Sequence, residues 1–191
     1  MPMPTFDQQV QLIAAKIRGA YLEMSSDIEF LLVDITCICL MRDERERNYI
    51  KEILVSSNML SKKIDFTASA LKVYNKEYYK IAEPHLIKFK QFKEMRNKLS
   101  HTRIIGDRDE IDLRTLWFVT FKDGELKETP FNVFDTYEAL KEYASAIEQL
   151  GNALIPRIYQ ERYLTRYSNT LSFPSNRIKS HWHRLQPGTI Q

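Results

Sequence analysis

The chain is poor in the residues that break or cross-link a fold. Its 191 residues include five glycines, seven prolines and two cysteines. So few glycines exclude a fold that depends on many tight turns, and they favour helices. Cys37 and Cys39 stand two positions apart in an apolar helical pattern, where they diverge by about 200° and cannot form a disulfide with each other. We therefore expect buried thiols in a reducing compartment and predict a cytoplasmic protein.

Long apolar runs are also missing. No run approaches the roughly 18 residues that a membrane-spanning helix needs. The longest candidate, residues 30–41, is interrupted by Asp34, and the N-terminus lacks the charged-then-apolar pattern of a signal peptide. We therefore expect no contact with a membrane. The composition, with 43% hydrophobic and 28% charged residues, is that of one globular domain with an extension.

The formal net charge of +3 conceals an uneven distribution. Residues 157–191 carry six basic side chains and one acidic side chain, whereas residues 1–156 carry 22 basic and 24 acidic ones. This contrast predicts a body at 1–156 and a basic, aromatic C-terminal extension at 157–191. Cations interleaved with aromatic rings suit single-stranded nucleic acid, so we predict RNA contacts by Arg157, Arg162 and Arg166. The tyrosines of the extension, four residues apart, suit packing on the body better.

Apolar residues recur three and four positions apart along most of the chain, which is the spacing of one helical face. The first stripe begins at Phe6 and predicts one long helix to about residue 41. Further helices are predicted over residues 49–60, over 66–74 and from Pro84 to about residue 99. A last helix is predicted to begin at Asp135 and to end or kink at Pro156.

The periodicity changes between residues 114 and 134. Residues 116–121 are rich in β-forming side chains, Asp123-Gly124 is a strong hairpin turn, and residues 126–133 form the returning strand. The sequence therefore predicts a mainly α protein. We expect an up-and-down helical bundle with a small β-hairpin at about 114–134, inserted before the last long helix.

The most informative stretch, residues 96–101 (RNKLSH), lies at the predicted end of the fourth helix. Arg96 is permanently charged and matches phosphate with a planar fork of donors, while His101 exchanges protons near neutral pH. Five helical positions correspond to about 500°, so the two side chains would point roughly 140° apart. We therefore predict that the helix ends between them and that residues 97–100 turn His101 back toward Arg96.

These side chains supply what metal-independent RNA cleavage requires. A general base takes the 2′-OH proton, the oxygen attacks the adjacent phosphate, and a cation stabilises the charge that develops. His101 suits the acid or base role and Arg96 the electrostatic role. The amide of Asn97 would orient the imidazole or a phosphate oxygen, and Lys98 would add attraction to the RNA backbone.

An Arg-Asn-x-x-x-His sequence at the end of an amphipathic helix, in a helical domain, resembles the HEPN superfamily. The resemblance covers about residues 6–155, and only Arg96, Asn97 and His101 carry over as functional positions. It implies a small helical bundle that forms a homodimer with two motifs at the interface. It further implies a metal-independent endoribonuclease of toxin–antitoxin, abortive-infection or other antiviral defence systems. RNA is then the substrate, no cofactor is needed, and a cognate antitoxin or regulator is a candidate partner.

Alternatives to these predictions stay open. Arg96 would otherwise cap the C-terminus of its helix, with His101 completing a turn. The domain would then be a non-catalytic helical module that binds RNA, a nucleotide or a partner protein. Asp27 is the candidate acid to support the site, although we favour a solvent-facing or ion-paired role for the acids of the first helix. His181 and His183 lack a further ligand, so no metal is assigned.

Overall fold

The structure is a computed structural model that describes residues 4–41, 44–57, 59–106, 113–122 and 124–161. These residues form five helices and three strands, which confirms the predicted mainly α fold with a hairpin before the last long helix. In chain order the elements are α1 (Phe6–Leu40), α2 (Glu44–Ser57), α3 (Leu60–Tyr74), α4 (Lys76–His101), β1 (Arg103–Gly106), β2 (Thr115–Lys122), β3 (Glu125–Asn132) and α5 (Val133–Tyr159).

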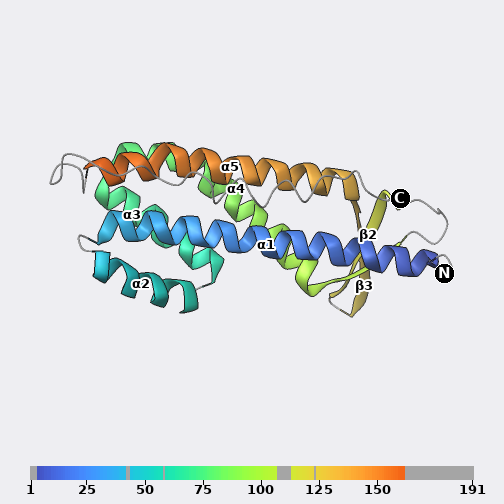
Figure 1. The fold of residues 1–191 in the computed structure, drawn as a ribbon. Coiled ribbons are helices and arrows are strands. Elements are labelled where there is room, and N and C mark those ends of the chain that lie inside the picture. The colour runs from blue at the N-terminus through green and yellow to red at the C-terminus, as the bar shows by residue number, and fades with distance from the viewer. Residues whose placement is uncertain (1–3, 42–43, 58, 107–112, 123, 162–191) are drawn as a thin grey trace.

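The helix α1 runs along the length of the molecule, and α5 runs beside it (Figure 1). The helix α4 crosses behind α1, α2 and α3 lie at one end, and the sheet lies at the other end. The C-terminal end of α4 therefore meets the sheet, while its N-terminal end lies with the small helices.

The length of α1 follows from its caps and from its apolar stripe. Thr5 and Gln8 form a capping box that starts the helix, a signal that the predicted stripe alone did not reveal. No proline interrupts the 35 residues, so the helix continues past the serine pair at 25 and 26. The predicted stripe is confirmed: its buried members are Val10, Ile17, Tyr21, Met24, Ile28, Leu31 and Ile35, with Phe6 and Ile13 half-buried.

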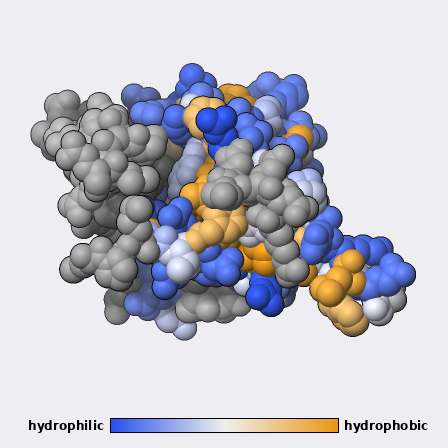
Figure 2. All heavy atoms as spheres, turned by 90° about the vertical axis from the view of Figure 1, so that its right-hand side faces the viewer, coloured by the Kyte–Doolittle hydropathy of each residue, from blue (hydrophilic) through white to orange (hydrophobic). Residues whose placement is uncertain are grey.

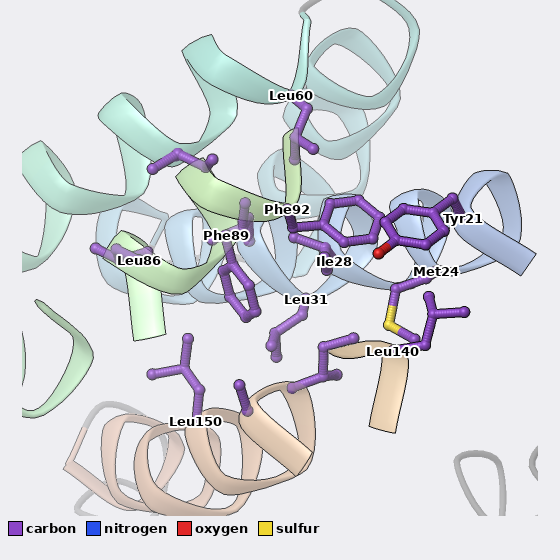
Figure 3. Close-up of a cluster of buried hydrophobic side chains, with 14 of the residues drawn as sticks. Tyr21, Met24, Ile28, Leu31, Leu60, Leu86, Phe89, Phe92, Leu140 and Leu150 are labelled. Carbon is purple, nitrogen blue, oxygen red and sulfur yellow. The ribbon is translucent and has the colours of Figure 1, made fainter. Parts of the chain in front are cut away.

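Aromatic rings join the three long helices in the core. The ring of Phe92 on α4 is fully buried and stacks on Tyr21 of α1, with 5.2 Å between the ring centroids. It also meets Tyr143 of α5 edge to face at 5.1 Å. Figure 3 shows this part of the core, where Phe89 and Leu150 extend the contact between α4 and α5. Phe92 of α4 thus contacts both α1 and α5 in the hydrophobic core.

The sheet is antiparallel in the order β1-β2-β3. Its β2–β3 hairpin confirms the predicted turn, with Gly124 at a φ of +82°. The strand β1 was not predicted. It packs tightly on the start of α1, because a Cβ placed on Gly106 would lie 2.6 Å from Cε1 of Phe6 and 2.8 Å from a methyl of Val10. Glycine is therefore required for this close approach.

Several predicted helix boundaries are wrong. The fourth helix starts at Lys76 rather than at Pro84, because the side chain of Asn75 caps it by accepting a hydrogen bond from the amide of Glu77 at 2.9 Å. Pro84 therefore lies inside α4, where the carbonyl of Lys80 loses its usual partner. The second helix spans 44–57 and the third starts at 60, both earlier than their apolar patterns indicated.

The last helix also differs from its prediction at both ends. It begins at Val133, because Asn132 rather than Asp135 caps it and accepts hydrogen bonds from two backbone amides. Of the two predicted effects of Pro156, an end of the helix is wrong, because α5 continues to Tyr159, and a kink stays a prediction. The proline removes only one helical hydrogen bond in the last turns, so the helix tolerates it.

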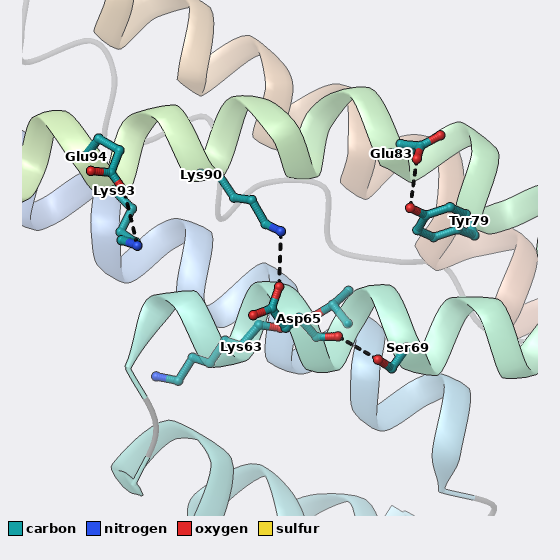
Figure 4. Close-up of polar contacts among 9 residues, drawn as sticks. Lys63, Asp65, Ser69, Tyr79, Glu83, Lys90, Lys93 and Glu94 are labelled. Carbon is teal, nitrogen blue, oxygen red and sulfur yellow. Dashed lines mark hydrogen bonds and ion pairs between the residues drawn. The ribbon is translucent and has the colours of Figure 1, made fainter.

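Three ion pairs connect the helices to one another. Lys63 of α3 is buried and forms an ion pair with Glu29 of α1 at 2.5 Å. Asp34, which interrupts an apolar run, pairs with Lys51 of α2 at 2.5 Å. At the surface, Lys90 of α4 reaches Asp65 of α3 at 3.2 Å (Figure 4). These pairs tie α2 and α3 to the long helices.

Cys37 and Cys39 are buried free thiols, as predicted, and burial raises the pKa of Cys37, with a further contribution from Asp34. None of the helices in the described ranges is long and apolar enough to span a membrane.

Candidate functional site at the end of α4

The helix α4 continues without a break through the whole RNKLSH stretch. It ends at His101, and Thr102 caps it with a backbone hydrogen bond to the carbonyl of Lys98. The prediction that residues 97–100 leave the helix is therefore wrong. Neither glycine nor proline occurs between residues 97 and 105, so nothing in the local sequence terminates the helix earlier. Within one chain, Arg96 and His101 consequently point about 140° apart.

Arg18 of α1 holds the end of α4 in place, a role that the sequence did not reveal. Its Nε donates to the carbonyl of Leu99 and its Nη2 to the carbonyl of Thr102, both at 2.8 Å. These oxygens belong to the end of the helix, where carbonyls lack helical partners and carry a partial negative charge. Beside this contact, Gln11 donates to the carbonyl of Ile104 in β1 at 3.3 Å. The chain on both sides of His101 is therefore fixed to α1.

Arg96 lies on the buried face of α4 rather than at its cap. It stands four residues after Phe92 and three before Leu99, both fully buried. Its Nη1 donates to Oδ1 of Asn97 at 3.3 Å, and its Nε is buried without a hydrogen-bond partner among the described residues. No ion pair is formed between Arg96 and a carboxylate in this part of the chain. The alternative in which Arg96 caps the helix does not hold, because Arg18 makes those contacts.

A second buried polar atom lies close by along the same helix pair. The hydroxyl of Tyr21 also has no hydrogen-bond partner in the described structure. Its pKa is raised, first by burial and then by the nearby Tyr143. Tyr21 stacks on Phe92, one helical turn before Arg96, and Arg18 lies one turn earlier on α1. Tyr21 and Arg18 of α1 therefore contact α4 about one turn before and one turn after Arg96. The sequence had indicated only Arg96 as a site residue.

His101, unlike Arg96, is exposed to solvent. It occupies the last position of α4, and its side chain is open to solvent, as is that of Lys98. Asn97 is half-buried beside Arg96. The end of α4 therefore presents an accessible imidazole on one side and a half-buried arginine, with its Nε enclosed, on another.

The other predicted site residues lie elsewhere. Asp27 is half-buried on α1, nine residues beyond Arg18, which is about 13 Å along the helix axis. Arg157 is exposed in the last turn of α5, near the opposite end of α4, where Tyr78 donates to Glu161. Their proposed roles stay predictions. Arg162, Arg166 and the His181–His183 pair lie outside the described residues.

One chain by itself does not bring the two predicted site residues together. The imidazole of His101 is open to solvent, and the guanidinium of Arg96, which has no carboxylate partner among the described residues, lies about 140° away around the same helix. Among the described residues, no three histidine, cysteine, aspartate or glutamate side chains are grouped closely enough to hold a metal ion. The fold and the site thus describe a helical bundle with an inserted antiparallel sheet and with basic residues at the end of α4. Comparisons with known protein families, curated proteins and solved structures give no match for this chain.

Replacing Arg18 by alanine is expected to lower the free energy of unfolding by about 1.5–3 kcal/mol, because it removes hydrogen bonds from a charged donor to two terminal carbonyls. Arg18→Lys should recover only part of the loss, since an ammonium cannot reproduce the planar fork. Urea denaturation measures the effect, with Lys62→Ala as the exposed control on α3. A loss within 0.5 kcal/mol of the control, the usual range for surface changes, would show that the contact contributes little.

Proposed function

We propose that this protein is a metal-independent endoribonuclease of the HEPN type. It cleaves RNA in a toxin–antitoxin, abortive-infection or other antiviral defence setting, and a cognate antitoxin or regulator restrains it. In the reaction, His101 takes the proton of a 2′-OH, the 2′ oxygen bonds to the adjacent phosphorus, and the bond to the 5′ oxygen breaks. The leaving oxygen is protonated, and the products end in a 2′,3′-cyclic phosphate and a 5′-OH.

The observation that carries the proposal is that Arg96 has neither a carboxylate partner nor an acceptor for its Nε among the described residues. A guanidinium on the buried face of a helix is costly unless an anion compensates it, and no carboxylate does so among the described residues. A phosphate would supply the missing negative charge and accept hydrogen bonds from the guanidinium. The exposed imidazole of His101 and the ammonium of Lys98 lie on the same stretch of helix, where an RNA backbone is attracted to them.

The divergence of the two side chains supports a homodimer in this proposal. Arg96 and His101 of one unbroken helix do not converge on one phosphate, whereas His101 of one copy and Arg96 of a second copy do so if their α4 termini meet. The proposed site therefore comprises Arg96, Asn97 and His101 from both chains.

The purified protein is expected to cleave single-stranded RNA in the presence of EDTA. A fluorescently labelled RNA of mixed sequence serves as substrate, and the 3′ ends are tested for a 2′,3′-cyclic phosphate by their resistance to a phosphatase until acid opens the ring. DNA of the same sequence is the matched control, because it lacks the 2′-OH. RNA that stays intact over a range of sequences, together with normal growth of cells that express the protein, would contradict the proposal.

The second candidate, a non-catalytic module that binds RNA, a nucleotide or a partner protein, is favoured by the same divergence of Arg96 and His101. In that case His101→Ala leaves RNA binding unchanged. Removal of Lys98 and Arg157 instead weakens binding in a salt-dependent way. Affinity measured at two salt concentrations tests this binding mode, and the absence of cleavage in EDTA by a protein that binds RNA separates it from the ribonuclease.

A further inference from the structure

The three-stranded sheet, at one end of the molecule (Figure 1), has an inner and an outer face. Successive residues of a strand point to opposite faces, and Leu116 and Phe118 of β2 are buried on the inner one. The alternating residues of β2 therefore lie on the opposite side, and the register adds their neighbours on β1 and β3. We call this side the outer sheet face, and its basic and large apolar members are Arg103, Ile105, Trp117, Val119, Phe121 and Leu126.

Large apolar side chains of the outer sheet face are open to solvent. Phe121 and Leu126 pair directly across β2 and β3 and are 75% and 69% exposed, while Trp117 is half-buried. On the inner face, in contrast, the rings of Phe118 and Phe131 are buried and stack with 4.2 Å between their centroids. Rings left in water forgo the free energy of burial, and a cluster of them marks an interaction surface. The outer sheet face is therefore a candidate binding surface.

An exposed cation lies on the same face. Arg103 stands beside Val119 in the register and forms no ion pair with the described residues. The only acidic residue of the face within the described strands is Glu128, which lies on the other side of Val119, about 10 Å from Arg103. Lys98 and His101, both exposed, precede Arg103 on the last turn of α4. A negatively charged ligand is therefore attracted to the β1 side of the face.

We propose that the outer sheet face binds single-stranded RNA, with bases stacked on Trp117 and Phe121 and a phosphate on Arg103. Aromatic rings on a sheet hold unpaired nucleotides of any sequence, because every base has a flat face. The two rings stand four residues apart on β2, about 13 Å, so they would hold bases of different nucleotides.

The charge of the face favours RNA over an apolar protein partner. An apolar partner would desolvate the guanidinium of Arg103 without compensating its charge, which is costly. The sugar-phosphate backbone instead places an anion next to each base, and a guanidinium binds phosphate oxygens through charge-assisted hydrogen bonds. The combination of exposed rings with an arginine that lacks an ion pair is thus what a single strand of RNA requires.

The outer sheet face would hold the RNA next to the proposed reaction site. Arg103 is two residues from His101, and Thr102 alone separates α4 from β1. Arg18 and Gln11 of α1 bind carbonyls on both sides of this junction. RNA on the sheet is therefore kept close to His101. This role as a substrate-holding surface rests on the proposed ribonuclease function, whereas the binding of RNA does not.

Fluorescence anisotropy of the full chain with a labelled 2′-O-methyl RNA of about 12 nucleotides measures binding without cleavage, because this probe has no free 2′-OH. Phe121→Ala should raise the Kd about 5- to 150-fold, the usual effect of losing one stacked base. Phe121→Tyr should bind as the wild type does, and Phe121→Leu, which is apolar but has no ring, as weakly as Phe121→Ala. The matched control is Phe66→Ala on α3, a half-exposed ring whose loss should leave the Kd unchanged.

Arg103→Gln tests the phosphate contact with the same probe. The slope of log Kd against log salt concentration should fall by about 0.7, the value for one phosphate contact to a single strand. Lys127→Gln is the matched control, because Lys127 is an exposed cation of β3 that pairs with Thr120 and so belongs to the other side of the sheet. It should leave the slope unchanged.

The inference is overturned by a probe that does not bind, or by equal Kd values for Phe121→Ala and Phe66→Ala. Wild-type affinity in Phe121→Leu would also overturn it, because apolar contact without stacking would then suffice. The surface and the ribonuclease fail separately. Cleavage of RNA by a protein whose affinity for the probe ignores Phe121 overturns the surface and leaves the ribonuclease. Binding that depends on Phe121, by a protein that leaves unmodified RNA intact in EDTA, supports the surface and contradicts the ribonuclease.

Discussion

His101→Ala is expected to lower the rate of RNA cleavage by about 10²–10⁴-fold, the usual contribution of a positioned proton-transfer group. The fold should be unaffected, because the imidazole is exposed at the last position of α4 and makes no hydrogen bond to another described residue. Single-turnover cleavage in EDTA measures the loss, and Ser100→Ala, the exposed neighbour on the same turn, is the matched control. Added imidazole should restore part of the rate in His101→Ala and none in the control.

Mixing two inactive variants shows which chain supplies each group. His101→Ala retains Arg96, and Arg96→Gln retains His101. If each site combines groups from two copies, mixed dimers contain one intact site, and an equimolar mixture recovers about one quarter of the wild-type activity. No recovery, with both variants folded and exchanging subunits, would contradict a site shared between chains. Equal activity of His101→Ala and wild type would remove the catalytic role of His101 altogether.

Phe92→Ala is expected to be the most damaging single change to stability. It removes a fully buried ring that stacks on Tyr21 and meets Tyr143 edge to face, so it leaves a cavity where α1, α4 and α5 join. Burial and cavity terms together predict a loss of about 3–5 kcal/mol, a large part of the stability of an ordinary domain. The corresponding fall in Tm is roughly 10 °C for a chain of this size.

The measurement for Phe92→Ala is chemical denaturation with an unchanged m-value, which attributes the shift to stability rather than to a change in the denatured state. Phe66→Ala on α3 is the control, because it deletes the same ring from a half-exposed position. A Phe92→Ala loss within 1 kcal/mol of the control would mean that neighbouring side chains close the cavity. The contact between the three helices would then be less rigid than its geometry indicates.

The elements that the sequence predicts well are those with strong local signals. The apolar stripe from Val10 to Ile35 has a helical period over many turns, and Asp123-Gly124 marks a tight hairpin, so α1 and the β2–β3 pair follow directly. The helix starts are predicted less well, because the sequence offers two plausible start signals for each helix. Asn75 and Asn132 are the actual N-caps, whereas Pro84 and Asp135 carry equally plausible local signals. Helix starts therefore differ by up to eight positions while the helices themselves are confirmed.

The features missed at the site depend on distant contacts. The four residues of β1 have too short a pattern to stand out, and they become a strand only by pairing with β2. Arg18 binds carbonyls that lie 81 and 84 residues away, and a backbone carbonyl has no signature in the sequence. The predicted helix end before His101 had no local stop signal behind it. It followed from the requirement that two side chains converge, which one chain does not meet.

The short connection between α4 and β1 has a mechanical consequence. Thr102 alone separates the last helical residue, His101, from the first strand residue, Arg103. The β2–β3 hairpin, whose tip exposes Phe121 and Leu126, is therefore joined to His101 almost without slack. Figure 2 views the molecule from this end, where apolar surface gathers on a projecting lobe. Because Arg18 and Gln11 also fix this segment to α1, the imidazole and the sheet keep a set position relative to each other, and no loop between them can change it.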